Sequence, residues 1–380
     1  MYIGIDVDKN FLVFEEIDEK GETIDKGKIE NSIQSLDRFA RNHRGKIALE
    51  ASSYSIPIYR HLVKLGFETH MAHPGTLDKI TKSSSKTDPH DASDLAQLLR
   101  TGYLPESWIA DEELQSIRSL IKRRVGIGQR FSQIKNKIHG LLALNGVKEP
   151  DCSDLFGRRG IHFLQDLRLS HKFGTVLESL LREMAYLEEE RSLLESRLAE
   201  ICRDERFKLQ VEQLMEIRGV GFYSAIGIIA LIGDMDRFPS DRKLCSWAGL
   251  VPRVRQSGKK EIHGHITKAG PRELRWLLIQ DAETAVRYPG KLRRFYLRKV
   301  RTRGHKKAIV AVAHKLLKII YHMLKEDKPY EERDDDLTYG KIRRMERMAN
   351  KNREKSPRFE ELERKGRETY IMEVSITGAG

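Results

Sequence analysis

Three strand patterns in a row open the chain, and they constrain its fold more than any other feature. Residues 2–7 alternate apolar side chains with others, as a half-buried strand does. Asp8-Lys9-Asn10 has turn chemistry, and residues 11–17 read as a second strand. Gly21 marks a further turn, and residues 24–29 read as a third strand. We therefore expect the chain to begin with two β-hairpins.

Helix and strand patterns alternate over the next seventy or so residues. Helical spacing occurs over 35–42 and 58–65, strand patterns occur over 46–50 and 67–72, and a helix starts at Asp88-Pro89 and runs to about Arg100. Strands interleaved with helices over a short stretch are typical of an α/β domain. We expect this domain to span residues 1–105.

Helical patterns dominate after Asp111. Residues 114–144 read as a basic helix, and residues 177–201 carry a heptad pattern with one polar position, Arg191. The heptad positions are Leu177, Leu180, Met184, Leu187, Arg191, Leu194, Leu198 and Ile201. Two interpretations stay open: a coiled-coil seam between subunits, or an amphipathic helix that packs within its own chain.

Residues 214–232 resemble a helix-hairpin-helix. A helix is expected to end near Arg218, Gly219-Val220-Gly221 to turn, and an apolar helix to follow. Glycines at such a turn let backbone N–H groups approach a phosphate, although glycine is common in helix–helix turns generally. The fold class predicted is α/β followed by α: a helical and coiled-coil segment over 106–208, a mainly helical domain over 209–328, and a polar tail over 329–380.

The composition excludes several classes of protein. A chain of 380 residues with 39% hydrophobic residues can bury cores in two or three domains. The longest apolar run, about 225–232, is too short to span a membrane, and the N-terminus does not read as a signal peptide. Three widely spaced cysteines indicate no disulfide scaffold, so a reducing, cytoplasmic setting is expected.

The positive charge is concentrated in one stretch. Residues 251–307 hold 17 Lys and Arg against 4 Asp and Glu, a net charge equal to the +13 of the whole chain. Arginines there alternate with Trp276, Tyr288, Phe295 and Tyr296, which suits phosphate contacts and base stacking. The stretch predicts a nucleic-acid partner more strongly than a solvated basic face or an anionic membrane.

Four carboxylates form the candidate metal site. Asp6 ends the polar face of the first expected strand, and Glu50 ends another expected strand. Asp88 and Asp91 are three residues apart at an expected helix start. Helix capping by Asp88 and Asp91 is the simpler explanation for that pair alone. The full set, however, matches an RNase H-like domain, in which acids on two strands and one helix hold one or two Mg²⁺ ions.

An ordered series of short motifs resembles the DEDD-type insertion-sequence transposases, relatives of the Piv DNA invertase. These motifs, spread over roughly residues 1–320, are Gly4-Ile5-Asp6-Val7, Ala48-Leu49-Glu50-Ala51-Ser52, Lys86-Thr87-Asp88-Pro89-His90-Asp91-Ala92, Arg218-Gly219-Val220-Gly221, Gly233-Asp234-Met235-Asp236-Arg237-Phe238, Ala248-Gly249-Leu250-Val251-Pro252-Arg253, Gln256-Ser257-Gly258-Lys259 and Ile266-Thr267-Lys268-Ala269-Gly270.

The resemblance implies a RuvC-like domain of the RNase H fold, a helical coiled coil, and a C-terminal transposase domain. It makes Asp6, Glu50, Asp88 and Asp91 the set that binds Mg²⁺, with Mn²⁺ as a substitute. Ser257 becomes the nucleophile that forms a covalent phosphoserine link to DNA. On local sequence alone, Ser257-Gly258 reads as a turn, and Ser224, Ser240 and Ser246 are rivals, of which Ser240 is expected to cap a helix and Ser224 to start one.

The partners expected from the resemblance are donor and target DNA and an element-encoded guide (bridge) RNA. The enzyme is expected to act on the nucleoid of a prokaryotic cell, as a dimer or dimer of dimers. DNA-backbone contacts are expected from Arg253, Arg255, Lys259, Lys260, His263, His265, Lys268, Arg272 and Arg275, and RNA contacts from Lys122, Arg123, Arg124, Lys135 and Lys137.

Two other functions remain open from the sequence. A metal-dependent nuclease of the RNase H or Holliday-junction resolvase type would use water as nucleophile, and Ser257 would only turn the chain. A non-enzymatic nucleic-acid organiser would use the acids as helix caps, and its binding would not depend on Asp6 or Asp88.

Overall fold

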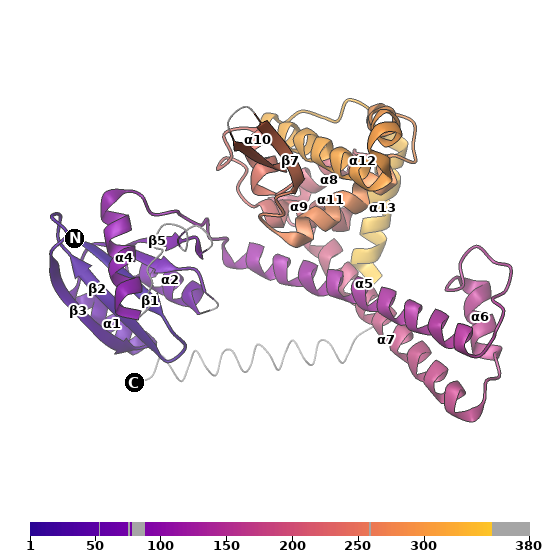
Figure 1. The fold of residues 1–380 in the computed structure, drawn as a ribbon, viewed down its shortest axis with the longest axis horizontal. Coiled ribbons are helices and arrows are strands. Elements are labelled where there is room, and N and C mark those ends of the chain that lie inside the picture. Colours follow the sequence, from indigo (N-terminus) through magenta and orange to yellow (C-terminus); the bar gives the residue numbers. More distant parts are fainter. Residues whose placement is uncertain (53, 75–76, 78–87, 258–259, 352–380) are drawn as a thin grey trace. The chain divides into compact units, whose positions relative to one another are not determined.

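The structure is a computed structural model, and it describes residues 1–52, 54–74, 77, 88–257 and 260–351. The chain divides into two compact units, Met1–Asp111 and Glu112–Gly380, each of which is described by itself (Figure 1). Among the described residues, no helix is both long enough and apolar enough to cross a membrane.

The first unit is built on a five-stranded sheet. Its elements are β1 (Tyr2–Val7), β2 (Phe11–Ile17), β3 (Thr23–Glu30), α1 (Ile33–Asn42), β4 (Lys46–Glu50), α2 (Ser55–Lys64), β5 (Glu68–Ala72) and α4 (Asp88–Thr101). The strand order is β3-β2-β1-β4-β5, with β1–β2 and β2–β3 antiparallel and β1–β4 and β4–β5 parallel. The predicted opening hairpins and the predicted alternation of helices and strands are therefore confirmed.

Helices cover both faces of this sheet (Figure 1). The face that carries Ile3 and Ile5 packs against α1 and α2 through Leu36, Ile58 and other buried side chains. The opposite face packs against α4, where Leu95 and Leu99 contact Ala48 and Ala72. The period-2 alternation of β1 thus turns Ile3 and Ile5 toward α1 and α2, and Gly4 and Asp6 toward α4.

Gly4 is the point of closest approach between α4 and β1. A Cβ atom at Gly4 would lie 1.9 Å from the carbonyl oxygen of Ala92 and 2.6 Å from the backbone nitrogen of Ala96. Only glycine leaves room for a helix backbone at this distance. The small residues Ala92 and Ala96 are fully buried on the helix side of the same contact.

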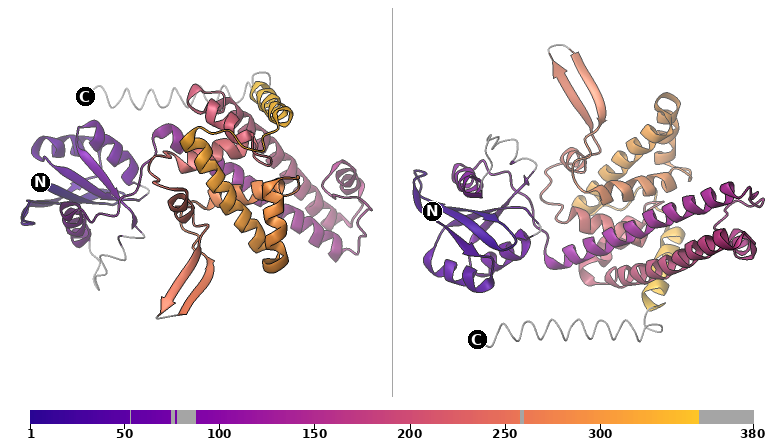
Figure 2. Two further views of the ribbon diagram at one scale, coloured as in Figure 1. Left: turned by 90° about the horizontal axis from the view of Figure 1, so that it is seen from above. Right: turned by 60° about the horizontal axis from the view of Figure 1, so that its bottom comes forward.

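The second unit is mainly helical. Its elements are α5 (Glu112–Leu144), α6 (Arg158–Asp166), α7 (His171–Ile201), α8 (Glu205–Met215), α9 (Phe222–Ile232), α10 (Asp241–Trp247), β6 (Pro252–Ser257), β7 (Lys260–Ile266), α11 (Arg272–Ala285), α12 (Lys291–Glu326) and α13 (Asp335–Lys351). Strands β6 and β7 pair as an antiparallel hairpin that projects from the helices of this unit (Figure 2).

The heptad seam of α7 is covered from within the chain. Leu177, Leu180, Met184 and Leu187 share a buried cluster with apolar residues of α5 over 127–142. Arg130 pairs with Glu183, and Arg124 pairs with Glu195, so the two helices run antiparallel. This geometry matches the interpretation of an amphipathic helix that packs within its own chain. The seam consequently gives no indication of the number of subunits.

The described part of the predicted polar tail contains a packed helix. Residues 335–351 form α13, which packs against α7 and α8. Met345 and Ala349 are almost fully buried, and the ammonium of Lys341 donates to the carbonyl oxygens of Met215 and Ile217. A low apolar content misleads here because a few well-placed contacts suffice to dock one helix.

The Gly219-Val220-Gly221 turn has a packing role. Gly219 has φ +98°, and a Cβ atom there would lie 2.5 Å from the carbonyl oxygen of Asp281 in α11. The turn leads into α9, which is almost entirely buried, as its apolar sequence predicts. Close packing against α11 therefore accounts for Gly219, and the phosphate contact proposed for this turn stays a prediction.

We expect Gly4→Ala to lower the free energy of unfolding of the first unit by about 1–3 kcal/mol, because the added methyl group forces α4 away from β1. Gly126→Ala is the control, since a Cβ atom at Gly126 in α5 meets open space. Gly126→Ala should stabilise α5 by as much as about 1 kcal/mol. Urea unfolding followed by circular dichroism measures both, and an unchanged midpoint for Gly4→Ala would contradict this account.

Candidate functional site

Asp6 and Glu50 lie on adjacent strands at the same end of the sheet. The parallel register pairs Gly4 with Ala48 and Ile5 with Leu49, so Asp6 and Glu50 follow the last pair on neighbouring strands. Side chains two residues apart on a strand share a face. Asp6 and Glu50 are therefore on the same face as Gly4 and Ala48, which is the face that α4 covers.

Helix α4 brings its N-terminus to the same end of the sheet. Its C-terminal turn contacts the β2–β3 connection, where Gln97 donates to the carbonyl oxygen of Gly21, opposite the acidic strand ends. The helix therefore runs antiparallel to β1, with Asp88 at its first residue and Asp91 one turn later. The side chain of Asp88 lies outside the described residues. Whether it caps the helix therefore stays a prediction.

Asp94 is an acid near this end that sequence reasoning missed. Burial, followed by the nearby charge of Asp91, raises the pKa of Asp94. The two residues are three apart on one helix, so their carboxylates are neighbours. An acid whose ionisation is opposed by another acid is a feature of sites that collect negative charge.

The donor chemistry at this end suits a hard divalent cation. Carboxylate oxygens from β1, β4 and α4 are the ligands that Mg²⁺ accepts. Among the described side chains, which exclude that of Asp88, no three His, Cys, Asp or Glu residues lie close enough together to hold a metal ion. The structure thus brings Asp6 and Glu50 together and directs the start of α4 toward them, while a complete ligand set stays a prediction.

Ser257 is the last residue of β6. It pairs with Lys260 across the end of the β6–β7 hairpin, and residues 258–259 between them lie outside the described residues (Figure 2). Its backbone therefore sits at the far end of a two-stranded projection, which is a place where a chain can reach a large substrate. The side chains of Arg255, Ser257, Lys260 and His263, together with Lys259, lie outside the description.

Two of the three rival serines have structural roles. Ser224 is buried, and its hydroxyl donates to Asp281 Oδ1 over 2.6 Å. Ser240 is the N-cap of α10, where its hydroxyl accepts from the backbone N–H of Lys243, as predicted. Ser246 is exposed on α10 and remains a rival.

The basic residues around the hairpin divide into exposed and engaged groups. Arg253, His265, Lys268 and Arg272 are exposed. Arg275 is half-buried, and its guanidinium donates to the carbonyl oxygens of Ala248, Ala269 and Gly270. Arg275 therefore holds the loop before α11 in shape, and its predicted DNA contact stays a prediction.

The basic residues of α5 divide in the same way. Lys122 and Lys137 are exposed, whereas Arg123 and Arg124 face glutamates of α7. Arg124 also lies over the ring of Tyr223, 4.9 Å from its centroid. Lys135 lies 4.7 Å from the centroid of the Phe156 ring and makes no ion pair with the described carboxylates.

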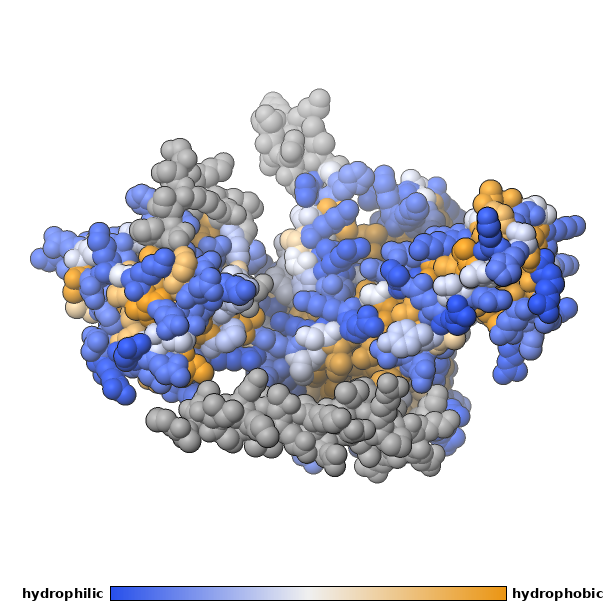
Figure 3. Space-filling view, turned by 90° about the horizontal axis from the view of Figure 1, so that it is seen from below, coloured by the Kyte–Doolittle hydropathy of each residue, from blue (hydrophilic) through white to orange (hydrophobic). Residues whose placement is uncertain are grey.

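The first half of α12 is a basic surface that the predicted contacts did not include. Residues 291–307 carry nine Lys and Arg and no acid. Arg298, Arg301 and Arg303 are exposed, and Gly304, with φ +71°, interrupts the helix after them. The signal was present in the charge count over 251–307, although that count cannot distinguish a helix face from a loop. Hydrophilic side chains also cover much of the surface drawn in Figure 3.

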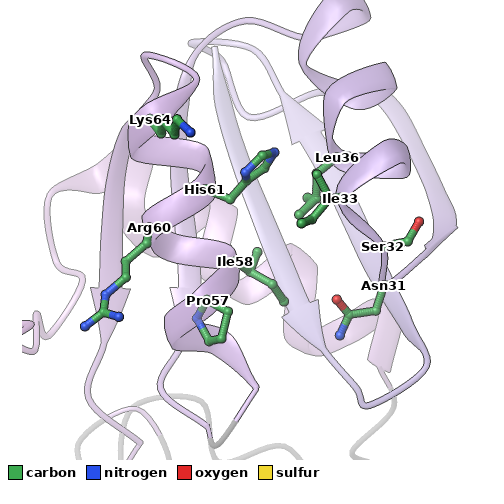
Figure 4. Close-up of a pocket in the computed structure, with 9 residues that line it drawn as sticks. All are labelled: Asn31, Ser32, Ile33, Leu36, Pro57, Ile58, Arg60, His61 and Lys64. Carbon is green, nitrogen blue, oxygen red and sulfur yellow. The ribbon is translucent and has the colours of Figure 1, made fainter. Parts of the chain in front are cut away.

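A separate cavity lies between α1 and α2 on the other face of the first sheet. It has a volume of about 430 Å³, and Figure 4 shows Ile33 and Leu36 facing Pro57, Ile58 and His61 across it. His61 Nε2 lies 2.8 Å from Asp37 Oδ1. Because this cavity lies on the face opposite α4, it is distinct from the acidic end of the sheet.

Two family models match the chain. Residues 3–145 match the DEDD transposase model of the IS110 type, and residues 211–297 match the model described as Transposase IS116/IS110/IS902 family. The first match contains all four acids, and the second contains Ser257.

Curated relatives agree with these matches. A putative transposase of Sinorhizobium fredii, y4qE, is 28% identical over 77% of this chain and 73% of its own length. The transposase for insertion sequence element IS1111A of Coxiella burnetii is 26% identical over 86% and 90%. A pilin gene-inverting protein of Moraxella lacunata is 33% identical over 32% and 38%.

The buried Ser224–Asp281 pair predicts a pH dependence of stability. Burial raises the pKa of Asp281 to about 8, although the Ser224 hydrogen bond and the charge of Lys341 oppose the shift. The unfolded chain releases this proton near pH 4, so between about pH 4 and 8 the folded state holds the extra proton. The free energy of unfolding therefore falls as pH rises through this window, by at most about 1.4 kcal/mol per pH unit.

Asp281→Asn should remove this loss, since an amide keeps the Oδ1 acceptor for Ser224 and does not titrate. Urea unfolding at pH 5, 6, 7 and 8 measures the effect, with Glu273→Gln on the same helix as the control. We expect the variant to gain stability over the parent as pH rises. An equal difference at all four values would contradict the assigned protonation.

Proposed function

Because the chain belongs to the IS116/IS110/IS902 family of transposases, enzymes that cut and rejoin DNA, we propose a composite mechanism for it. Ser257 would lose its hydroxyl proton to solvent, attack a DNA phosphate and form a covalent phosphoserine link. The bond between phosphorus and one deoxyribose oxygen would break, and that oxygen would leave as a deoxyribose hydroxyl. Asp6, Glu50, Asp88 and Asp91 would hold Mg²⁺. The covalent link conserves the energy of the broken bond, so strands can be exchanged and resealed without a nucleotide cofactor.

The observation that carries this proposal is the acidic end of the first sheet. Asp6, the residue before the end of β1, and Glu50, the last residue of β4, lie on adjacent parallel strands on the face that α4 covers, and the N-terminus of α4 reaches the same end. The strand order β3-β2-β1-β4-β5, with two antiparallel and two parallel pairings, is that expected of an RNase H-like domain. This arrangement supports a metal-binding role over helix capping because capping requires no acids on the strands.

Each residue has a distinct task in this mechanism. The carboxylates would hold the metal, which, when bound, stabilises negative charge that develops on phosphate oxygens. A serine hydroxyl is a weak nucleophile near neutral pH and must lose its proton to react. The placement of Ser257 at the end of the β6–β7 hairpin would let the strand enter a DNA groove and present the hydroxyl to phosphate.

The finer partners follow from the same proposal. We propose that an element-encoded guide RNA binds the basic face of α5, with Lys122, Lys135 and Lys137 as phosphate contacts. Strand exchange between two DNA molecules requires paired active sites, so a dimer or dimer of dimers is the working assembly. The α7 seam gives no argument for that contact, because its residues from Leu177 to Leu187 pack against α5 of the same chain.

The second candidate is a metal-dependent nuclease or junction resolvase in which water attacks the phosphate. The acidic end of the sheet supports it as well as it supports the first proposal. The two differ in one product, a protein–DNA covalent adduct, which only the serine mechanism forms.

We expect Ser257→Ala to abolish the adduct and strand exchange while DNA binding survives. The assay incubates the protein with Mg²⁺, element-encoded RNA and labelled donor and target DNA, and then separates the products on a denaturing gel. Asp6→Asn, Asp91→Asn and removal of Mg²⁺ with a chelator should each abolish the adduct too, since the phosphate charge is then left uncompensated.

Ser246→Ala is the matched control, because Ser246 is the exposed rival, and it should leave the adduct unchanged. An adduct that persists in Ser257→Ala and disappears in Ser246→Ala would move the nucleophile to α10. Cleavage that depends on Asp6 without any adduct would favour the nuclease.

We further expect the basic half of α12 to bind the DNA backbone. Replacing Arg298, Arg301 and Arg303 by Gln should weaken DNA binding for all sequences alike and flatten its salt dependence. The slope of log K against log salt should fall by about 0.9 for each lost phosphate contact. Lys9, Lys20 and Lys26 on the opening hairpins, changed to Gln together, control for net charge, and an unchanged slope in the α12 variant would contradict this role.

A further inference from the structure

A large groove in the second unit is not part of the acidic site or the β6–β7 hairpin. It has a volume of about 850 Å³ and lies where α5, α7, α6 and α11 meet. Its volume falls within the range of built ligand sites, which is about 300–1,000 Å³. The lining combines apolar, aromatic and polar side chains from these four separate parts of the chain.

Three aromatic rings line the groove from three directions. Phe131 comes from α5, Phe156 from the segment before α6, and Trp276 from α11. All three are half-buried, so part of each side chain stays accessible to a ligand. Aromatic rings that stay exposed around a cavity are typical of sites that stack flat ligands, including nucleic-acid bases.

Cations lie against two of these rings. Arg191 Cζ is 5.5 Å from the centroid of Phe131, and Lys135 Nζ is 4.7 Å from that of Phe156. Arg191 also faces Glu188 and Glu195 on its own helix. Lys135, in contrast, makes no ion pair with a carboxylate of the described chain, so its charge is available to a phosphate.

Amide side chains complete the lining. Gln129, Gln165 and Gln280 are exposed at the groove, one each from α5, α6 and α11. An amide offers both a donor and acceptors, which suits the hydrogen-bonding edges of an unpaired base. Three cations, Arg124, Lys135 and Arg191, stand against one acid, Glu188, in the lining. Arg124 and Arg191 are paired with Glu195 and Glu188, so Lys135 is the cation that leaves the lining with a net positive charge. This balance favours an anionic ligand over a neutral or basic one.

We propose that this groove binds unpaired bases of single-stranded nucleic acid. A base stacks on Trp276 or Phe131, the glutamines contact its edge, and Lys135 contacts the adjoining phosphate. This inference rests on the proposed function only in that the protein handles nucleic acid. It deepens that function by assigning the single-stranded segment a location away from the nucleophile and the acids.

The test compares labelled strands of one mixed sequence, about twelve nucleotides long, as single-stranded RNA, as single-stranded DNA and as the DNA duplex. Trp276→Ala should lower the affinity for a single strand by about tenfold, the loss expected for one stacked base. Trp276→Phe should restore the affinity, since a ring remains. Affinity for the duplex should not change, because its bases are already stacked on one another.

Matched controls make the result specific. Tyr186→Ala removes an exposed ring of α7 that does not line the groove, and it should leave every affinity unchanged. The effect of Trp276→Ala should disappear for strands that carry abasic sites. A loss confined to RNA assigns the groove to RNA, and a loss confined to DNA assigns it to DNA; both support the proposal.

The proposal is overturned if Trp276→Ala weakens the duplex as much as the single strand, or weakens neither. Direct fluorescence guards against a folding defect. A single strand should quench the tryptophan emission of the unmodified protein more than that of Trp276→Phe, which keeps Trp108 and Trp247, and an abasic strand should quench neither. Ser257→Ala should bind single strands with unchanged affinity. Failure of the groove and failure of the serine mechanism are therefore distinguishable.

Discussion

The direct contact between the backbones of α4 and β1 is what the acidic end of the first unit depends on. Gly4 has no side chain, so the carbonyl of Ala92 can lie where a Cβ atom would be. This contact fixes both the distance of α4 from the sheet and the turn of the helix that meets β1. Asp6, two residues beyond Gly4, and Asp91, one residue before Ala92, are positioned by the same contact. The absence of a side chain at Gly4 thus determines where the carboxylates of Asp6 and Asp91 are placed.

Local periodicity explains why the strands and the Asp6 and Glu50 positions could be predicted. Each acid follows a run whose alternation fixes its face, and that information is contained in six or so neighbouring residues. The neighbour relation between β1 and β4 is different, because it depends on strand order across the whole sheet. The orientation of α4 depends likewise on contacts such as Gln97 with Gly21, 76 residues apart. The placement of Asp6, Glu50 and the start of α4 at one end of the sheet therefore required the fold.

The heptads of α7 and the charged C-terminal segment show the limits of local patterns in two ways. A heptad seam indicates that an apolar stripe is buried, and it has the same appearance whether the partner is another subunit or α5. The low apolar content of 335–351 hid the docking of α13, which uses Met345, Ala349 and the Lys341 ammonium. The groove was inaccessible to sequence reasoning for a related reason, since Phe131 and Trp276 meet only when α5 and α11 pack.

The proposed chemistry divides according to the rigidity that each step requires. Metal ligands must be held within narrow geometric limits, and strand ends backed by two helical layers provide that precision. A nucleophile that enters DNA needs reach instead, which the hairpin carrying Ser257 offers. Unpaired bases need aromatic side chains that are already held in place, and ordered helices supply them. If a ring had to be immobilised on binding, the lost side-chain entropy would reduce the affinity. The groove between α5, α7 and α11 meets this requirement, since its rings are anchored on packed helices and the segment beside them.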